Sequence, residues 1–312
     1  MPLVSMARLL DEARLNRYAV CYCESWNLES FVAVAEAAEE LGSPIITGFN
    51  GGFLRHPTRS KPEDLAYYAG LGLSLRHSPI RAAFLLNETD DFGQIERGLE
   101  LGFNAVMVDN ERLEKSAYTA LVKEVVEMAH RAGATVEAAI GLLADGAGHI
   151  KAEATSAADA KQFVESTGVD ALGVSVGNVH ILTEGKAPIH LDALEAIHDC
   201  VTVPLVLHGG TGIPLEAIDR YVRRGVAKIN FGTGLKQAYL EAVRSALAKY
   251  RQPMSPHPFL GIGGEEDILR AGRDAVKQKV KELIQMCGAA GRARQPNAQE
   301  TTASCESRAL RA

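Results

Sequence analysis

The residues with the clearest chemical potential lie in one short stretch, 205–214, which reads Leu-Val-Leu-His-Gly-Gly-Thr-Gly-Ile-Pro. Its apolar start predicts a buried strand, and His208 stands where that strand would end. The glycines and Thr211 predict a turn with accessible backbone N–H groups, just before a helix that opens near Pro214. A histidine beside such a turn can bind a metal ion and an anion together. We therefore predict a binding site here.

A scaffold must hold this site, and the chain alternates short apolar runs with helical patterns. The runs suit buried parallel strands, and they cover residues 18–23, 44–49, 80–86, 105–108, 135–140, 171–175, 205–207 and 227–230. The helical patterns include 28–41, 92–101, 118–132, 157–166, 215–223 and 234–249. Eight strand–helix units predict an α/β fold, the TIM (β/α)8 barrel. A doubly wound sheet would carry a Gly-rich fingerprint after its first strand, and 21–26 holds no glycine.

Composition sets the limits of the fold and of its partners. With 312 residues, 46% of them hydrophobic, the chain fits one large barrel or two ordinary domains. A net charge of −6 argues against a nucleic-acid partner, and no apolar run is long enough for a membrane span. We expect a cytoplasmic barrel over 1–290 and a disordered tail over 291–312, where Gly, Ala, Arg and polar residues dominate.

The carboxyl ends of the predicted strands carry more polar residues than packing requires. Active sites of TIM barrels lie at those ends, which here hold Glu24, Asn50, Asn87, Glu88, Asp109, Glu137, Asn178, His180, His208, Asn230 and Thr233. Taken singly, each residue is ordinarily a helix cap or a loop residue with its hydrogen bonds satisfied. Two histidines and a carboxylate at one barrel mouth favour a metal site.

These residues lie in motifs that resemble the class II, zinc-dependent ketose-bisphosphate aldolases, over about 4–293. The resemblance is carried by Gly-Asn-Val-His at 177–180, by 207–214, and by 225–230 leading to Thr233. It implies that His180 and His208 are zinc ligands. It also implies a substrate phosphate site; our predicted substrate-binding set is Asn50, Gly209, Gly210, Thr211, Asn230 and Thr233.

The chain departs from that family where the third strand ends. The family has His-x-Asp-His there, with the Asp as acid/base and the second His as third ligand, whereas this chain has Leu-Leu-Asn-Glu at 85–88. An amide has no ionisable proton near neutral pH, so Asn87 can bind a substrate oxygen without replacing that acid/base. Glu88 can replace an imidazole, and with His180 and His208 it would suit zinc, iron or manganese. Alternatively, Glu88 faces solvent or pairs with a lysine.

Other carboxylates could move the proton instead. The family's Glu-x-Glu-x-Gly keeps only Glu137, and the loop glutamates after it are replaced around Asp145 and Ala147. Asp145 or His149 could enter the site from that loop. Glu24 stands where the family has Asn, either as a relocated acid/base or as a carboxylate that interacts with a helix dipole. The family's glycine after strand six is Ile181, and its Asp two residues beyond Asn230 is Gly232.

These observations predict a metal-dependent lyase acting on a small phosphorylated or otherwise anionic oxygenated substrate. We expect one divalent metal, Zn²⁺ first and Fe²⁺ or Mn²⁺ next, and weak or absent cleavage of fructose 1,6-bisphosphate. The predicted catalytic residues are Glu24, Asn87 and Glu137. An isomerase, epimerase or decarboxylase using the same enolate, or a silent ligand-binding homologue, are the alternatives. The resemblance also implies a homodimer or homotetramer.

Overall fold

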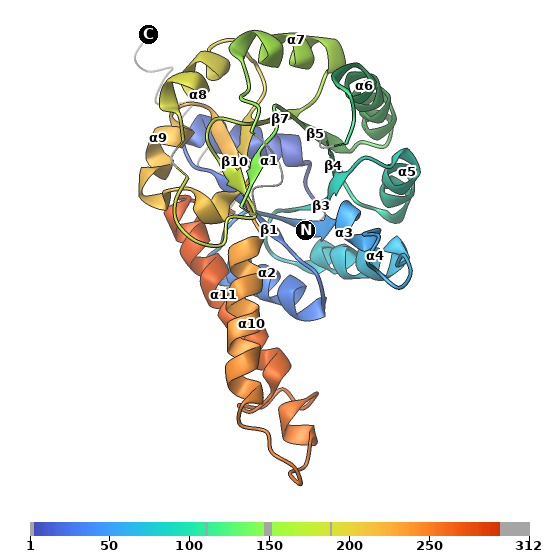
Figure 1. Cartoon of the computed structure of the whole chain (residues 1–312), viewed down its shortest axis with the longest axis vertical. Coiled ribbons are helices and arrows are strands. Elements are labelled where there is room, and N and C mark those ends of the chain that lie inside the picture. Colours follow the sequence, from blue (N-terminus) through green and yellow to red (C-terminus); the bar gives the residue numbers. More distant parts are fainter. Residues whose placement is uncertain (1–2, 110–111, 147–151, 188, 294–312) are drawn as a thin grey trace, which may run out of the picture.

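Parallel strands close into a barrel surrounded by helices, as Figure 1 shows. The structure is a computed structural model that describes residues 3–109, 112–146, 152–187 and 189–293. Around the barrel the strand order is β1-β10-β9-β7-β5-β4-β3-β2. The barrel strands are β1 (Val20–Glu24), β2 (Ile45–Asn50), β3 (Ala82–Thr89), β4 (Ala105–Val108), β5 (Thr135–Ile140), β7 (Ala171–Val174), β9 (Leu205–Leu207) and β10 (Val226–Phe231). The predicted TIM barrel is confirmed.

Helices surround the barrel, and most of them connect one strand to the next. They are α1 (Met6–Asn16), α2 (Leu28–Glu40), α3 (Gly51–Leu54), α4 (Leu65–Leu73), α5 (Phe92–Leu101), α6 (Lys115–Arg131), α7 (Ala157–Thr167), α8 (Leu191–His198), α9 (Ile218–Val222), α10 (Thr233–Leu247) and α11 (Ile268–Met286). Short 3-10 turns are η1 (Ser74–His77), η2 (Gly210–Gly212), η3 (Leu215–Ala217) and η4 (His257–Phe259). Local sequence sets the helix starts: Asn27 and Ser30 form a capping box at α2, and the Asp91 side chain caps α5.

The main departures from the predicted strands concern the site. The third strand was expected to end at residue 86, but β3 continues to Thr89 and so includes Asn87 and Glu88. A further pair of strands, β6 (Ala144–Asp145) and β8 (Val179–His180), forms a small parallel sheet outside the barrel. Strands of two residues are too short to produce a recognisable sequence pattern. The second sheet therefore positions His180 in a way that periodicity did not predict.

Strand packing inside the barrel is close enough to constrain individual residues. A Cβ added at Gly48 of β2 would lie 1.8 Å from the carbonyl oxygen of Leu85 on β3, so only glycine fits. Phe84 of β3 stacks on Phe103, with ring centroids 4.0 Å apart. The first contact fixes β2 against β3, and the second fixes β3 against the segment that precedes β4. Both β2 and β3 contribute side chains to the region around Glu88.

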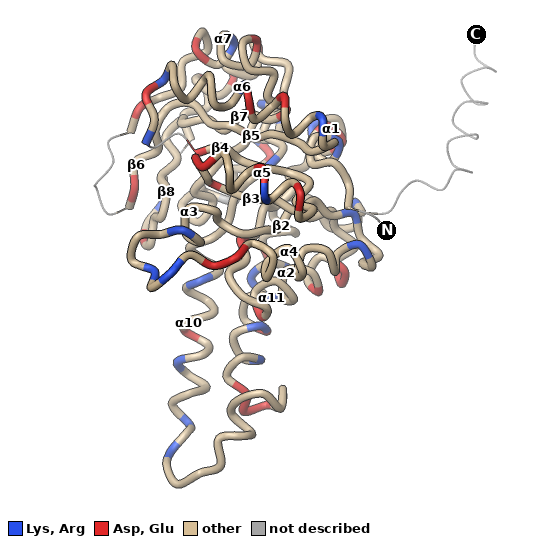
Figure 2. Tube along the Cα trace, turned by 90° about the vertical axis from the view of Figure 1, so that its right-hand side faces the viewer, with Lys and Arg blue, Asp and Glu red and all other residues tan. Residues whose placement is uncertain are grey.

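Two long helices extend away from the barrel as an antiparallel hairpin. Figures 1 and 2 show α10 and α11 side by side, with basic and acidic residues interspersed along them. The inner end of α10 begins at Thr233, directly after β10, and α11 also packs on α2. Within the described residues, none of the helices is long and apolar enough to cross a membrane.

The packed chain continues past the predicted domain boundary at 290. Gly291 N–H donates to the Leu41 carbonyl and Ala293 N–H to the Gly42 carbonyl, both at 2.8 Å, and Ala293 is buried. Residues 291–293 therefore belong to the barrel rather than to the tail. The rest of the predicted tail, 294–312, lies outside the described residues.

Candidate active site

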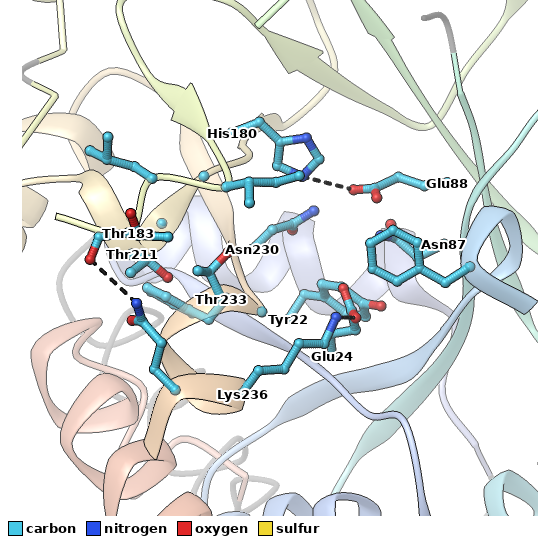
Figure 3. Close-up of a pocket in the computed structure, with 18 of the residues that line it drawn as sticks. Tyr22, Glu24, Asn87, Glu88, His180, Thr183, Thr211, Asn230, Thr233 and Lys236 are labelled. Carbon is cyan, nitrogen blue, oxygen red and sulfur yellow. Dashed lines mark hydrogen bonds and ion pairs between the residues drawn. The ribbon is translucent and has the colours of Figure 1, made fainter. Parts of the chain in front are cut away.

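A cavity of about 380 Å³ opens at the carboxyl ends of the barrel strands. Figure 3 shows its polar side chains pointing inward from several elements of the barrel. The predicted site residues that line it are Glu24, Asn87, Glu88, His180, Gly209, Gly210, Thr211, Asn230 and Thr233. His208 lines an adjoining smaller hollow that it shares with Glu88 and His180. The structure thus brings together most of the residues that sequence selected.

Glu88 faces both histidines. Its Oε1 lies 3.3 Å from His208 Nδ1 and 3.7 Å from His180 Nε2. Donor atoms of a tetrahedral zinc site are about 3.3–3.6 Å apart, since each lies about 2.0–2.2 Å from the ion. One carboxylate and two imidazoles are also suitable ligands for a divalent metal. The donor set therefore fits a metal, although no group of three His, Cys, Asp or Glu in the described part of the chain is already arranged to hold one.

The end of β3 turns to present Glu88 to the histidines. The pairing of β3 with β4 shifts register between Leu86 and Thr89, and Glu88 has a φ of 51°. Asn50 Nδ2 donates to Glu88 Oε2 at 2.6 Å, while Asn50 Oδ1 caps α3. Burial opposes ionisation, but the charges of His180 and His208 hold the pKa of Glu88 well below its ordinary value. Asn50, predicted to bind substrate, instead holds this carboxylate and is not among the residues that line the cavity.

A fully buried ion pair contacts the His208 ring nitrogen that does not face Glu88, and it orients the ring. Its Nε2 lies 2.8 Å from Glu137 Oε1, and Lys228 Nζ lies 2.7 Å from Glu137 Oε2. Burial opposes ionisation of Glu137, but the positive charge of Lys228 and the His208 contact lower its pKa below the ordinary value. Such an outer carboxylate fixes the orientation of a ligating imidazole. Glu137, a predicted proton-transfer residue, is thus withdrawn from the cavity and holds His208.

Lys228 was missed in the sequence. It lies within the apolar strand β10, where a lysine is unusual because burying an ammonium without a partner is costly. A lysine within an otherwise apolar strand was the signal in the sequence that could have identified it. It indicated a buried carboxylate in the barrel, and the partner is Glu137.

The loops after β9 and β10 form a compact cradle of backbone and hydroxyl groups. Gly209 has a φ of 71°, and a Cβ there would lie 2.1 Å from the Val179 carbonyl oxygen. Thr211 Oγ1 accepts a hydrogen bond of 3.0 Å from Gly234 N–H, which ties this loop to the first turn of α10. Loop amides and a helix N-terminus together are suited to an anion. Ile181 lies on the rim, with 46% of its surface exposed.

Unpaired polar atoms are concentrated on the cavity wall. Of the five such buried side-chain atoms among the described residues, four belong to Tyr22, Asn87 and Asn230. These side chains are 1%, 1% and 7% exposed, and all three line the cavity. Each unsatisfied buried group costs about 1–3 kcal/mol. A polar ligand placed among them would supply the missing partners.

A second charged pair lines the cavity away from the histidines. Glu24, at the end of β1, pairs with Lys236 in the first turn of α10, and Figure 3 shows this contact below His180 and Glu88. Lys236 Nζ also lies over the Phe53 ring, 4.5 Å from its centroid. Burial and the charge of Glu88 raise the pKa of Glu24 although Lys236 opposes them. Sequence reasoning did not select Lys236, because a lysine in a helical pattern is ordinarily solvent-exposed.

Comparison with known proteins agrees with this geometry. Residues 4–292 match the family model of class II fructose-bisphosphate aldolase. The chain belongs to this family. Class II aldolases are carbon–carbon lyases that generally depend on a divalent metal.

Individual aldolases match over nearly the whole chain. The fructose-bisphosphate aldolase of Geobacillus stearothermophilus is 34% identical over 298 residues, which cover 95% of this chain and all of that protein. That of Staphylococcus aureus Mu50 is 33% identical over 302 residues, with 94% and 100% coverage. The crystal structure of the YdjI aldolase from Escherichia coli K12 superimposes with a TM-score of 0.76 at 28% identity, covering 94% of this chain and 100% of that one.

Within this class II aldolase the expected acid/base position is occupied by an amide. Asn87 points into the cavity from the same strand end as Glu88. Of the loop residues considered as substitutes, Asp145 lies in β6, paired with β8, while Ala147 and His149 lie outside the described residues. Among the residues that the structure describes, Glu24 and Glu88 are the carboxylates that line the main cavity.

Proposed function

We propose that this class II aldolase is a metal-dependent lyase for a small phosphorylated or otherwise anionic oxygenated substrate. We further propose that it cleaves fructose 1,6-bisphosphate weakly or not at all. The observation that carries this proposal is Asn87, which occupies the wall of the cavity where the family resemblance calls for an ionisable acid/base. General acid/base catalysis is worth about 10²–10⁴-fold in rate.

Glu88, His180 and His208 would hold the metal. Glu88 Oε1 lies 3.3 Å from His208 Nδ1 and 3.7 Å from His180 Nε2, close to the separation of donor atoms in a tetrahedral site. Zn²⁺ is the first choice for two imidazoles and one carboxylate, and Fe²⁺ or Mn²⁺ can use the same set. When bound, a divalent ion supplies charge stabilisation for a carbonyl oxygen or an enediolate.

The chain's own polar residues would bind and orient the substrate. The amides of Gly209 and Gly210, with the hydroxyls of Thr211 and Thr233, suit an anionic group. Asn87 and Asn230 carry unpaired polar atoms on the wall of the cavity, where they can hydrogen-bond substrate oxygens. These contacts would hold the substrate in one orientation and exclude water from its reacting carbons.

Glu24 is the carboxylate best placed to transfer a proton. It lines the cavity, and its pKa is raised by burial, which brings a carboxyl closer to the working pH of a general acid/base. Its carboxylate would accept the proton of a substrate hydroxyl on the oxygen that Lys236 does not hold, and the Lys236 ammonium would stabilise the carboxylate form before that transfer. Glu137 would keep His208 in place rather than exchange protons with substrate.

A coupled assay with fructose 1,6-bisphosphate tests the proposal. The metal-loaded protein should turn over far below the ordinary range of about 1–10³ per second. Asn87→Asp restores an ionisable group and should increase the rate of cleavage by tenfold or more. Asn16→Asp, the same substitution at an exposed position at the end of α1, is the control and should leave the rate unchanged.

Two outcomes would contradict the proposal. Ordinary turnover of fructose 1,6-bisphosphate by the unmodified protein would show that another group has replaced the acid/base. Binding of ketose phosphates by the metal-loaded protein without release of a triose phosphate from any of them would show that the chain is not a lyase. Interconversion of such ligands without cleavage would identify an isomerase or epimerase instead.

A further inference from the structure

We infer that the Glu24–Lys236 pair selects substrates with a single phosphoryl group. The pair forms the part of the cavity wall that faces the rest of the substrate, where its two charges balance and its polar atoms can bind hydroxyl groups. This inference builds on the proposed function, because it assumes that one phosphoryl group occupies the Gly209–Gly210–Thr211 cradle. It names the substrate class as ketose monophosphates with an uncharged, hydroxylated remainder.

The pair is built into the cavity rather than resting on the surface. The Glu24 side chain is only 10% exposed, and that of Lys236 is 32% exposed. Lys236 Nζ lies 4.5 Å from the centroid of Phe53 and 5.9 Å from that of Trp26. Trp26 in turn packs edge-on against Tyr239 of α10. These aromatic neighbours restrict the lysine to the vicinity of Glu24.

The backbone at Gly232 also leaves room for the Glu24 carboxylate. A Cβ added at Gly232 would lie 3.1 Å from Glu24 Oε2 and 3.6 Å from Glu24 Cδ. That separation is tighter than an ordinary van der Waals contact, so a larger residue at 232 would displace the carboxylate. Glycine at the start of α10 therefore makes room for a carboxylate supplied by β1.

The charges on the cavity wall argue against a second phosphoryl group. Lys236 is the sole lysine or arginine among the described residues that line the main cavity, and its charge is already matched by Glu24. A phosphate monoester carries about −1.5 to −2 charges. A second one placed near the pair would meet no uncompensated lysine or arginine among the described residues that line the cavity, so its charge would stay unbalanced.

The same wall is suited to hydroxyl groups. A carboxylate accepts hydrogen bonds from hydroxyls, and an ammonium donates to their oxygens. Tyr22 adds a buried hydroxyl with no partner, and Asn230 adds an amide whose oxygen and nitrogen both lack one. A polyhydroxylated chain can satisfy all of these groups without bringing a net charge.

Calorimetric titration with fructose 1-phosphate and fructose 1,6-bisphosphate tests the inference, because these probes differ only in the second phosphoryl group. In the metal-loaded protein, the bisphosphate should bind at least about tenfold more weakly. Glu24→Gln keeps the side-chain shape but leaves the Lys236 charge without a partner. It should therefore reduce the ratio of the two dissociation constants about tenfold or more. Lys236→Met leaves the Glu24 charge without a partner and should increase that ratio. Thermal unfolding of each variant checks its fold.

Two results would overturn the inference. One is tighter binding of the bisphosphate than of the monophosphate by the unmodified protein, and the other is an unchanged affinity ratio in both folded variants. Failure of both probes to bind would also overturn it, together with the cradle. The proposed lyase function fails separately, when the monophosphate binds with the expected preference and ketose 1-phosphates release no triose phosphate.

Discussion

Lys228 Nζ lies 2.7 Å from Glu137 Oε2, and neither side chain is exposed to solvent. Burial lowers the pKa of Lys228 although Glu137 opposes this effect, so the two charges depend on each other. Glu137 uses its other oxygen to hold His208. The pair therefore connects the interior of the barrel to a predicted metal ligand.

Replacing Lys228 with Met should lower the free energy of unfolding by about 3–5 kcal/mol, because a carboxylate would remain buried without its counter-charge. Denaturant unfolding measures this change. The double variant Glu137→Gln/Lys228→Met should recover part of the loss, since no unmatched charge then remains. Lys279→Met, a substitution of a partly exposed lysine on α11, is the control. A loss no larger than that of the control would show that the buried pair contributes little.

Single replacement of Glu88, His180 or His208 by Ala should remove bound divalent metal at pH 7. Elemental analysis of the purified proteins measures the metal, with about one ion per chain expected in the unmodified protein. His257→Ala, at an exposed histidine, should retain that content. Full metal occupancy in Glu88→Ala would mean that the carboxylate is not a ligand. Occupancy should also fall at acid pH, because ligating imidazoles must be unprotonated.

Gly209→Ala should abolish anion binding in the cradle. The new Cβ would collide with the Val179 carbonyl oxygen, and a φ of 71° is unfavourable for alanine. Crystals soaked in sulfate should show density near Thr211 and Thr233 in the unmodified protein and none in the variant. Gly264→Ala, where a Cβ meets no atom within 4 Å, should leave the density unchanged. An empty cradle in the unmodified protein, filled by Ile181 or Phe231, would instead exclude a phosphate ester as substrate.

Asp267 should make stability depend on acid pH. Its Oδ2 accepts hydrogen bonds from Gly261 and Gly263 N–H at 2.7 and 2.8 Å, and its Oδ1 caps α11 through Leu269 N–H at 2.9 Å. Burial opposes ionisation, yet these hydrogen bonds hold the pKa of Asp267 below its ordinary value. A carboxyl with a lower pKa in the folded state stabilises fully above its unfolded pKa of about 3.9. That stabilisation is lost as pH falls through the folded pKa.

Asp267→Asn should therefore lower the free energy of unfolding at pH 7 by about 1–2 kcal/mol, because it replaces the charged acceptor of several hydrogen bonds by a neutral amide. The difference from the unmodified protein should shrink when the pH is lowered below about 4. Denaturant unfolding across this range measures both effects, with Asp274→Asn, further along α11 and half exposed, as the control. A difference that does not change with pH would show that the carboxylate charge is unimportant.

The sequence predicted the barrel because its signals are local. Each strand is a short apolar run and each helix a periodic pattern, and the eight units follow one another in order. The glycine-rich turn that we propose to bind an anion was predictable for the same reason, since 207–214 is contiguous in the chain. In contrast, the pairs Glu137–Lys228 and Glu24–Lys236 join residues far apart in sequence. Their partners become apparent only once β1, β5 and β10 are placed in space.

The role of each carboxylate was also beyond sequence reasoning. Asn50 ends β2 as predicted, whereas Glu137 lies in the middle of β5. Their side chains turn to Glu88 and His208 rather than into the main cavity. Position along a strand fixes which end of the barrel a residue reaches. The direction of a side chain depends additionally on register shifts and on neighbours from other strands.

The backbone conformation of Glu88 implies that the protein gives up some stability for function at this position. In a regular strand, adjacent side chains alternate in direction, yet Asn87 and Glu88 both line the cavity, and Glu88 adopts a left-handed φ of 51°. That conformation disfavours residues with a Cβ by about 1–2 kcal/mol, whereas glycine adopts it freely. The variant Glu88→Gly should therefore have a higher free energy of unfolding than Glu88→Ala, although both lack the carboxylate. The difference between their free energies of unfolding measures the conformational strain at position 88. The barrel tolerates this strain to keep two neighbouring functional groups on one side of a strand.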